Sequence, residues 1–189
     1  MQDNLIKFWN HPPGKQNVGA SYLNIFKSIS NILGALKQKG YTIKDRLPSD
    51  EEIKKLILLG GRNVGSYAPG ELDKLITKGK VIKIPLTQYK KWFKELDTGF
   101  QEEVIRQWGS PDEFKLMAKN NNIIIPAINL GNILLLAQPS RGFSADPEKL
   151  YHDTKLYPHH QYIAFYLWLK KEFNANAIIS LGKHGTHEW

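Results

Sequence analysis

The stretch NIIIPAINLGNILLLAQPSRG, residues 122–142, contains two apolar runs separated by a short turn. The runs are NIIIPAI (122–128) and ILLLAQ (133–138), and neither alternates apolar with polar residues. Unalternated runs of this length are typical of strands that are covered on both faces of a sheet. Pro126 lacks a backbone N–H, which predicts a strand end or a bulge at that position. The stretch therefore predicts central strands with helices packed against them.

Two more strands are predicted near the ends of the chain. LIKFW (5–9) is a short apolar run before a turn cluster, and AIISL (177–181) has the pattern of a buried strand. Apolar residues between 22 and 36 recur at intervals of three and four, which predicts an amphipathic helix after the first strand. A helix is also predicted over 160–173, before the last strand. This order of strands and helices indicates an α/β layer fold.

The middle of the chain is charged and helical in pattern. Ser49, followed three residues later by Glu52, forms a capping box that predicts a helix ending near Leu59. Shorter helices are predicted at 71–78, 87–96 and 99–108. We therefore expect a single α/β domain over residues 1–189, with a mostly parallel sheet flanked by helices and a helical insertion near 48–110.

The composition is that of a soluble globular protein. Among the 189 residues, 41% are hydrophobic and 23% are charged, and no apolar run is long enough to span a membrane. The N-terminal residues lack the basic and apolar regions of a signal peptide, so a cytoplasmic location is expected. Cysteine is absent, which excludes disulfides and thiolate metal sites. Any bound metal must therefore have nitrogen or oxygen ligands.

Positive charge is concentrated in the first half of the chain. Residues 1–94 contain 17 Lys/Arg and 7 Asp/Glu, whereas residues 95–189 contain 9 and 11, and the formal net charge is +8. A basic half indicates either contact with an anion or a solvated lysine-rich surface. The anion could be a nucleic acid, a nucleotide or a small molecule with several carboxylates. Basic and aromatic residues are not interleaved as in nucleic-acid-binding modules, so no nucleic-acid partner is expected.

Three polar segments follow predicted strands: NHPPGK after the first, QPSRG after a central strand and GKHGTHE after the last. Ligands of open α/β sheets bind outside the carboxyl ends of the strands, so these segments are expected to share one crevice. PPGKQNVG is not a phosphate-binding loop of the Walker type, because the required Gly and Ser/Thr positions hold other residues. The residues assigned to substrate binding are Arg141, His11, Lys15, Gln138, His152, His159 and His160.

The segment HGTHE, residues 184–188, concentrates two histidines and a carboxylate. It matches neither helical zinc-protease pattern, and its glycine argues against a helix. Imidazole and carboxylate groups together suit a divalent ion such as cobalt or zinc, and they equally suit a general base with its orienting partner. A turn-capping histidine beside an exposed one is the structural alternative. The metal-ligand candidates are His184, Glu188 and His187.

Six segments in a fixed order resemble a known family. They are NHPPGKQNVGASYLN, WGSP, LGNILLLAQPSRGF, LYHD, PHHQYIAFYLWLKKEF and LGKHGTHEW, and they cover nearly all of the chain. In this order they are similar to the cobaltochelatase/magnesium-chelatase large-subunit family. The QPSRG and HEW segments favour the cobalt branch. Family members are far longer and continue past the Trp of this motif, so the resemblance implies a segment of a longer large subunit.

The resemblance implies a specific activity. A large subunit of this family binds a tetrapyrrole and is the site of metal insertion, while an AAA+ subunit and an integrin-like companion use ATP to drive the reaction. In the cobalt branch the substrates are divalent cobalt and a corrin precursor of the hydrogenobyrinic acid a,c-diamide type. The alternatives are magnesium insertion into protoporphyrin IX and a tetrapyrrole-binding module without catalysis. The isolated segment is expected to be inactive.

Two residues of the family motif carry over, and both are expected to be catalytic. His184 matches a motif histidine that holds or transfers the ion, and Glu188 matches the motif carboxylate, which can accept a ring proton. The family has His where this chain has Ser180, and an apolar residue where it has His187. His187 is therefore not assigned a family role, and the metal preference is open.

Overall fold

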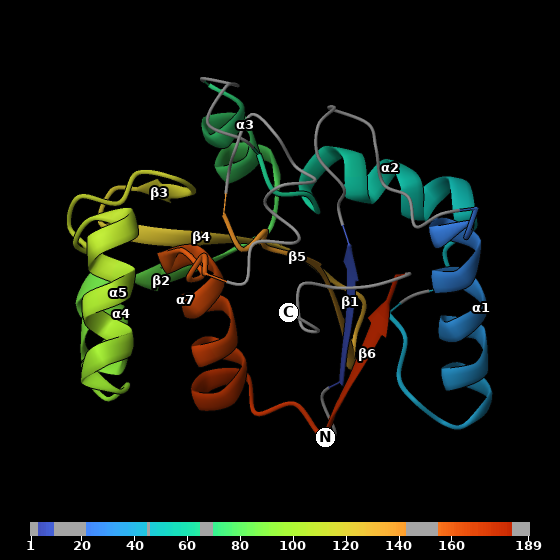
Figure 1. The fold of residues 1–189 in the computed structure, drawn as a ribbon. Helices are drawn as coiled ribbons and strands as arrows, with labels where there is room; N and C mark the ends of the chain where they lie inside the picture. Colours follow the sequence, from blue (N-terminus) through green and yellow to red (C-terminus); the bar gives the residue numbers. More distant parts are fainter. Residues whose placement is uncertain (1–3, 10–21, 45, 65–69, 143–154, 183–189) are drawn as a thin grey trace.

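The computed structural model describes residues 4–9, 22–44, 46–64, 70–142 and 155–182. In this part of the chain a sheet is flanked by helices on both faces (Figure 1). The strands are β1 (Asn4–Trp9), β2 (Val81–Pro85), β3 (Ala118–Lys119), β4 (Asn122–Asn129), β5 (Ile133–Gln138) and β6 (Ala177–Leu181). The helices are α1 (Ile25–Gln38), α2 (Asp50–Gly60), α3 (Glu71–Lys78), α4 (Leu86–Phe93), α5 (Thr98–Trp108), α7 (His160–Trp168) and the π-helical turn η1 (Leu169–Phe173).

The sheet has the strand order β2-β4-β5-β1-β6, and β3 pairs with β4 outside this path. The α/β class with flanking helices is as predicted, but the sheet is mixed and not mostly parallel. β1 is parallel to both β5 and β6, whereas β4 is antiparallel to β2, β3 and β5. The physical reason lies in the connections. Only residues 130–132 join β4 to β5, and so short a link permits only antiparallel pairing, whereas α7 and η1 form a crossover between β5 and β6.

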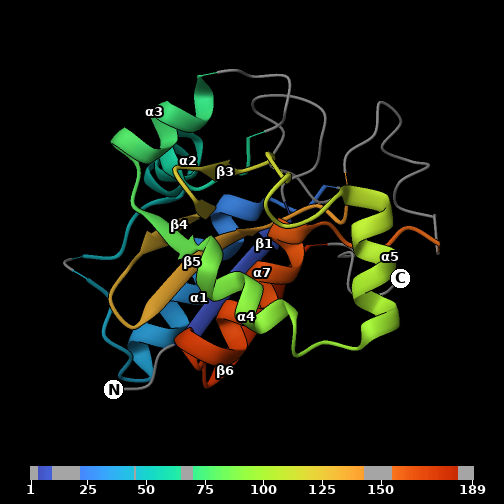
Figure 2. The same ribbon diagram turned by 90° about the vertical axis from the view of Figure 1, so that its left-hand side faces the viewer.

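The sheet separates two apolar clusters, with α1 and α7 on opposite faces (Figure 2). Successive residues of a strand point to opposite faces, so Leu5 packs in the cluster beneath α4, α5 and α7, while Ile6 and Phe8 pack against α1 and α2. β5 is buried at every position, as its unalternated sequence predicts. Pro126 lies inside β4, at the junction where pairing passes from β2 to β5.

β6 differs from the prediction of a buried strand. Within the described residues it pairs with β1 alone and forms one edge of the sheet. Ile178 is 47% exposed, and Ser180 is exposed as well. A short apolar run predicts a strand but carries no information about how many neighbours the strand has.

Local sequence signals account for the helix starts. Asn24 caps α1 by accepting the N–H of Lys27 at 3.0 Å. The predicted capping box of α2 is present, because Ser49 and Glu52 each accept a backbone N–H of the other residue. The region 48–110 contains α2 to α5, as expected of the helical insertion, but it also contributes the strand β2 to the sheet.

A matched pair of glycine substitutions tests the turn that joins β4 to β5. Gly131 has φ +94°, and a Cβ there would lie 2.6 Å from the carbonyl oxygen of Thr42. Gly131→Ala is therefore expected to lower the free energy of unfolding by about 2 kcal/mol or more, because strain and overlap add. Gly34, inside α1, has no atom near its Cβ position, so Gly34→Ala should raise stability by about 0.5–1 kcal/mol.

Urea unfolding of both variants measures the two effects. A Gly131→Ala variant as stable as the wild type would contradict the close approach of residues 42–44 to this turn, which is also marked by a bridge between Ile43 and Gly131.

Candidate functional site

The carboxyl ends of β5, β1 and β6 lie side by side, as the sequence predicts. Trp9 at the end of β1 pairs with Gln138 of β5, and Phe8 pairs with Leu181 of β6. Residues 10–21 and 183–189, which follow β1 and β6, lie outside the described residues, as does 143–154. Six assigned residues fall in these segments, and their roles stay predictions: His11, Lys15, His152, His184, His187 and Glu188.

Gln138 is held at this edge by the segment after α2 and, through it, by α7. It is 4% exposed, and its carbonyl oxygen accepts from Nδ2 of Asn63 at 3.1 Å. Oδ1 of Asn63 in turn accepts from Nε2 of Gln161 on α7 at 2.9 Å. Asn63 and Gln161 were not expected from the sequence. They join the segment after α2 to α7 across the end of β5, and so fix the place of Gln138.

Arg141 lies three residues beyond β5 and is only 7% exposed. Its Nη2 donates to the carbonyl oxygen of Leu156, and its own carbonyl accepts the N–H of His159 at 2.9 Å. The Nη1 atom is buried, and no described residue accepts a hydrogen bond from it. A buried donor without an acceptor is costly, and a guanidinium is suited to bind carboxylates. Arg141 therefore has donor capacity for an anionic ligand.

His159 is fully buried and caps α7. Its Nδ1 accepts the N–H of Tyr162 at 3.3 Å, and its ring packs against Trp108 and Phe114, with centroids 5.8 and 5.4 Å away. Burial lowers the pKa of His159 from 6.5 to about 3. The imidazole is therefore neutral at physiological pH. In this arrangement His159 supports the helix start, and its predicted contact with substrate stays a prediction.

His160 joins α7 to α4. Its Nε2 lies 2.9 Å from the carbonyl oxygen of Gly109, which can only accept, so Nε2 carries the proton. Its Nδ1 then accepts from the Tyr89 hydroxyl at 2.7 Å. Burial lowers the pKa of His160 and raises the pKa of Tyr89, so both groups are neutral. Both ring nitrogens are used within the fold, and a substrate role for His160 likewise stays a prediction.

Lys7 is a buried cation that the sequence pattern did not single out. It lies in the middle of β1, is 2% exposed, and donates to the Tyr166 hydroxyl of α7 at 3.1 Å. Burial lowers the pKa of Lys7 to about 8 and raises the pKa of Tyr166. The signal in the sequence was a single lysine within the apolar run NLIKFW.

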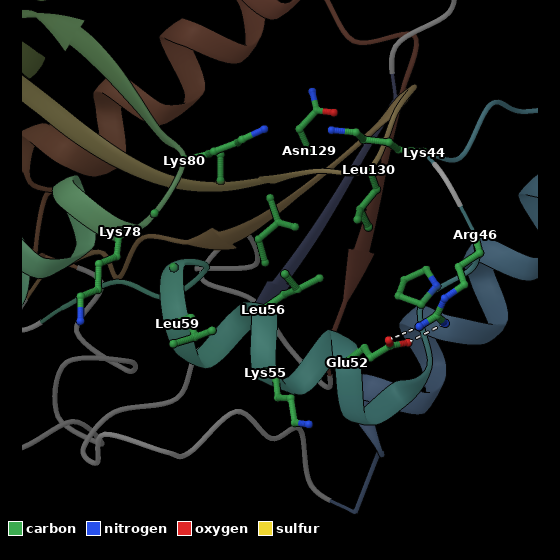
Figure 3. Close-up of a pocket in the computed structure, with 15 residues that line it drawn as sticks. Lys44, Arg46, Glu52, Lys55, Leu56, Leu59, Lys78, Lys80, Asn129 and Leu130 are labelled. Atoms are coloured by element: carbon green, nitrogen blue, oxygen red, sulfur yellow. Dashed lines mark hydrogen bonds and ion pairs between the residues drawn. The ribbon is translucent and has the colours of Figure 1, made fainter.

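A second candidate region is a groove along α2 (Figure 3), at the end of β5 opposite to Gln138. Its volume is about 620 Å³. Leu56 and the 71%-exposed Leu59 contribute apolar surface, and Glu52 pairs with Arg46. Four lysines line it without an ion pair to any described residue: Lys44, Lys55, Lys78 and Lys80. Part of the basic character of the first half of the chain is thus gathered in this groove.

Two features are absent from residues 4–9, 22–44, 46–64, 70–142 and 155–182, the part of the chain that the structure describes. In these ranges, no group of three or more His, Asp or Glu side chains lies close enough together to hold a metal ion. No helix there is both long and apolar enough to cross a membrane.

Comparison with known proteins identifies the family. Residues 5–189 match the family model described as CobN/Magnesium Chelatase. The chain belongs to this family. An uncharacterised protein of Methanocaldococcus jannaschii is 36% identical over 191 residues, which cover 97% of this chain and 15% of that protein. The aerobic cobaltochelatase subunit CobN of Sinorhizobium sp is 32% identical, with coverage of 84% and 12%.

Both metal branches of the family are represented among its relatives. A magnesium-chelatase subunit of Chlorobaculum parvum is 32% identical, with coverage of 96% of this chain and 13% of the relative. The catalytic subunit of cobaltochelatase from Mycobacterium tuberculosis has a similar structure, with a TM-score of 0.73 and 30% identity over all of this chain and 15% of that one. The chain thus spans 12–15% of the length of these family members.

The buried imidazole of His159 predicts a loss of stability in mild acid. Its pKa is lower in the folded than in the unfolded chain, so the unfolded state binds more protons between pH 6.5 and about 3. The contribution of the neutral imidazole to the free energy of unfolding is complete above pH 6.5 and declines as the pH falls. Between pH 7 and pH 5 the loss for this residue is about 2 kcal/mol.

Urea unfolding at the two pH values, compared with His159→Asn, isolates this effect. Asparagine retains an oxygen that can cap α7 but does not titrate. The variant should therefore lose clearly less stability than the wild type between pH 7 and pH 5, whatever its stability at pH 7. Equal losses in the two proteins would rule out a neutral, buried His159.

Proposed function

We propose that this chain forms part of the large, tetrapyrrole-binding subunit of an ATP-dependent chelatase that inserts cobalt into a corrin precursor. The observation that carries the proposal is the family match over residues 5–189, which includes relatives named as cobaltochelatase subunits. The whole reaction belongs to a protein far longer than this chain, since the relatives are covered only to 12–15%.

The edge of the sheet supplies groups that suit such a ligand. A corrin precursor carries carboxylates and amides around a flat apolar ring. Arg141 has a buried, unmatched guanidinium donor at this edge, and guanidinium groups bind carboxylates in a bidentate manner. Gln138 lies beside it at the end of β5. We propose that these two residues contact the periphery of the ring.

The chemistry of insertion assigns the remaining roles. The divalent ion must lose bound water, and two ring N–H groups must lose their protons. A neutral His184 can hold or transfer the ion, and the carboxylate of Glu188 can accept a proton. These roles rest on the motif residues at these positions. The AAA+ subunit and its integrin-like companion are the proposed partners that hydrolyse ATP, and the complex is proposed to act in the cytoplasm.

Magnesium insertion into protoporphyrin IX is the second candidate function. The Chlorobaculum relative, named as a magnesium-chelatase subunit, is as similar to this chain as the Sinorhizobium CobN. The family motif has a histidine where this chain has Ser180, so the strand that leads to the motif lacks one imidazole here. A tetrapyrrole-binding module without catalysis would have the same ring-contacting residues, but its function would not depend on the carboxylate of Glu188.

Substitution of the proposed proton acceptor tests catalysis. Glu188→Gln in the complete large subunit, assayed with its ATPase partners, should slow cobalt insertion by about 100-fold or more, because a positioned general base contributes on that order. His184→Ala should do the same. Glu172→Gln is the matched control, since Glu172 is an exposed carboxylate on η1 and its loss should leave the rate unchanged.

Insertion is measured by the change in the absorption spectrum of the ring, with cobalt and magnesium supplied separately. Unchanged insertion of both metals by Glu188→Gln would eliminate the catalytic assignment. Faster insertion of magnesium than of cobalt would select the second candidate.

A further inference from the structure

Lys7 occupies a position where an apolar residue is expected. β1 is hydrogen-bonded on both sides, and Lys7 is in register with Leu136 of β5 and Ser180 of β6. Leu5, the preceding residue on the same face, is fully buried. Placing an ammonium group here costs stability unless a partner compensates it, and an apolar side chain of similar size would pack without that cost.

The described surroundings of Lys7 do not include a compensating anion. Its hydrogen bond goes to the Tyr166 hydroxyl, and its Nζ lies 5.4 Å from the centroid of the same ring. Among the described residues no Asp or Glu forms an ion pair with it, and burial is the cause of its lowered pKa. A hydroxyl and a ring face offset only part of the desolvation of a positive charge.

The face on which Lys7 lies continues onto β6, where the described residues leave side chains exposed. Paired residues of parallel strands point to the same face, so Ile178 shares the face of Leu5, and Ser180 shares that of Lys7. Both residues of β6 are exposed, although the corresponding positions of β1 are buried. Among the residues that the structure describes, α7 therefore covers the β1 side of this face, while Ile178 and Ser180 on the β6 side stay exposed.

The side of α7 toward Lys7 adds aromatic surface. Tyr162 and Tyr166 are one helical turn apart and half-buried, and their ring centroids are 4.9 Å apart. Phenol rings at this spacing can pack against a flat apolar molecule, and their hydroxyls can bind a polar group at its edge. The combination suits a planar ligand that carries an acid.

We propose that the Lys7 ammonium and the Tyr166 hydroxyl bind a carboxylate of the ligand on the face that α7 and β6 share, with Ser180 at its margin. This inference rests on the proposed function, because it takes the ring as the bearer of the carboxylate. It adds a second carboxylate position to the one assigned to Arg141. It also gives a reason for retaining a costly lysine in the centre of the sheet.

Paired ligands separate the carboxylate contact from ring binding as a whole. The corrin precursor hydrogenobyrinic acid a,c-diamide and its methyl ester, dissolved in the same detergent, are titrated into the chain, and binding is followed by the absorbance of the ring. The wild type should bind both, and the free acid more tightly. Lys7→Met should weaken binding of the acid about tenfold or more, the size expected for a lost charged hydrogen bond, and should leave the ester unchanged.

Two further variants complete the test. Lys83→Met removes an exposed lysine from β2 and should change neither affinity, which controls for net charge. Tyr166→Phe removes the hydroxyl alone and should weaken binding of the acid by a smaller factor. This variant also keeps the inference testable if Lys7→Met fails to fold.

The outcomes distinguish the two proposals. If the wild type binds the rings but Lys7→Met and Tyr166→Phe change the acid and the ester alike, or change neither, the assignment of Lys7 is wrong and the proposed function stands. If the wild type binds neither ring, ring binding by this chain fails, and the role of Lys7 fails with it.

Discussion

The insertion of β1 between β5 and β6 is the constraint on which the described fold depends. Residues 4–9 pair on one side with 133–138 and on the other with 177–181, so the sheet forms only when distant parts of the chain meet. Such long-range pairing costs a large amount of chain entropy. Helices cover the strands on both faces of the sheet, and the apolar contacts between them offset this cost. It also places the ends of three parallel strands at one edge, where Gln138 and Arg141 lie.

The two faces of the sheet are specialised differently. The face covered by α1 and α2 is apolar, with Ile6 and Phe8 of β1 at its centre. The face covered by α7 includes a buried lysine, a buried histidine pair and the amide link between Asn63 and Gln161. Polar groups in such positions cost stability, and natural proteins retain them chiefly at functional sites. The distribution agrees with a ligand site on the α7 side.

Much of this fold follows from the sequence, because strong local signals and the final structure agree. The capping box at Ser49 begins α2, and the apolar run 133–138 is a buried strand. The mixed sheet did not follow, because strand direction depends on the lengths of the connections and not on the apolar runs themselves. VIKIP (81–85) was missed, since its strand character comes from pairing with β4. Arg141 was selected from its motif, and its role in binding stays a prediction. Lys7 was not selected, because the burial of a lysine depends on packing between segments that are distant in the sequence.

The ring is proposed to bind on the α7 and β6 side of the sheet. Nuclear magnetic resonance of the chain with ¹³C-labelled lysine, recorded during addition of hydrogenobyrinic acid a,c-diamide, tests this most directly. The signal of Lys7 should shift as the ring binds, while those of Lys55, Lys78 and Lys80 in the groove along α2 should stay in place. Shifts confined to the groove lysines, with Lys7 unchanged, would place the ring at the other end of the sheet and contradict the account.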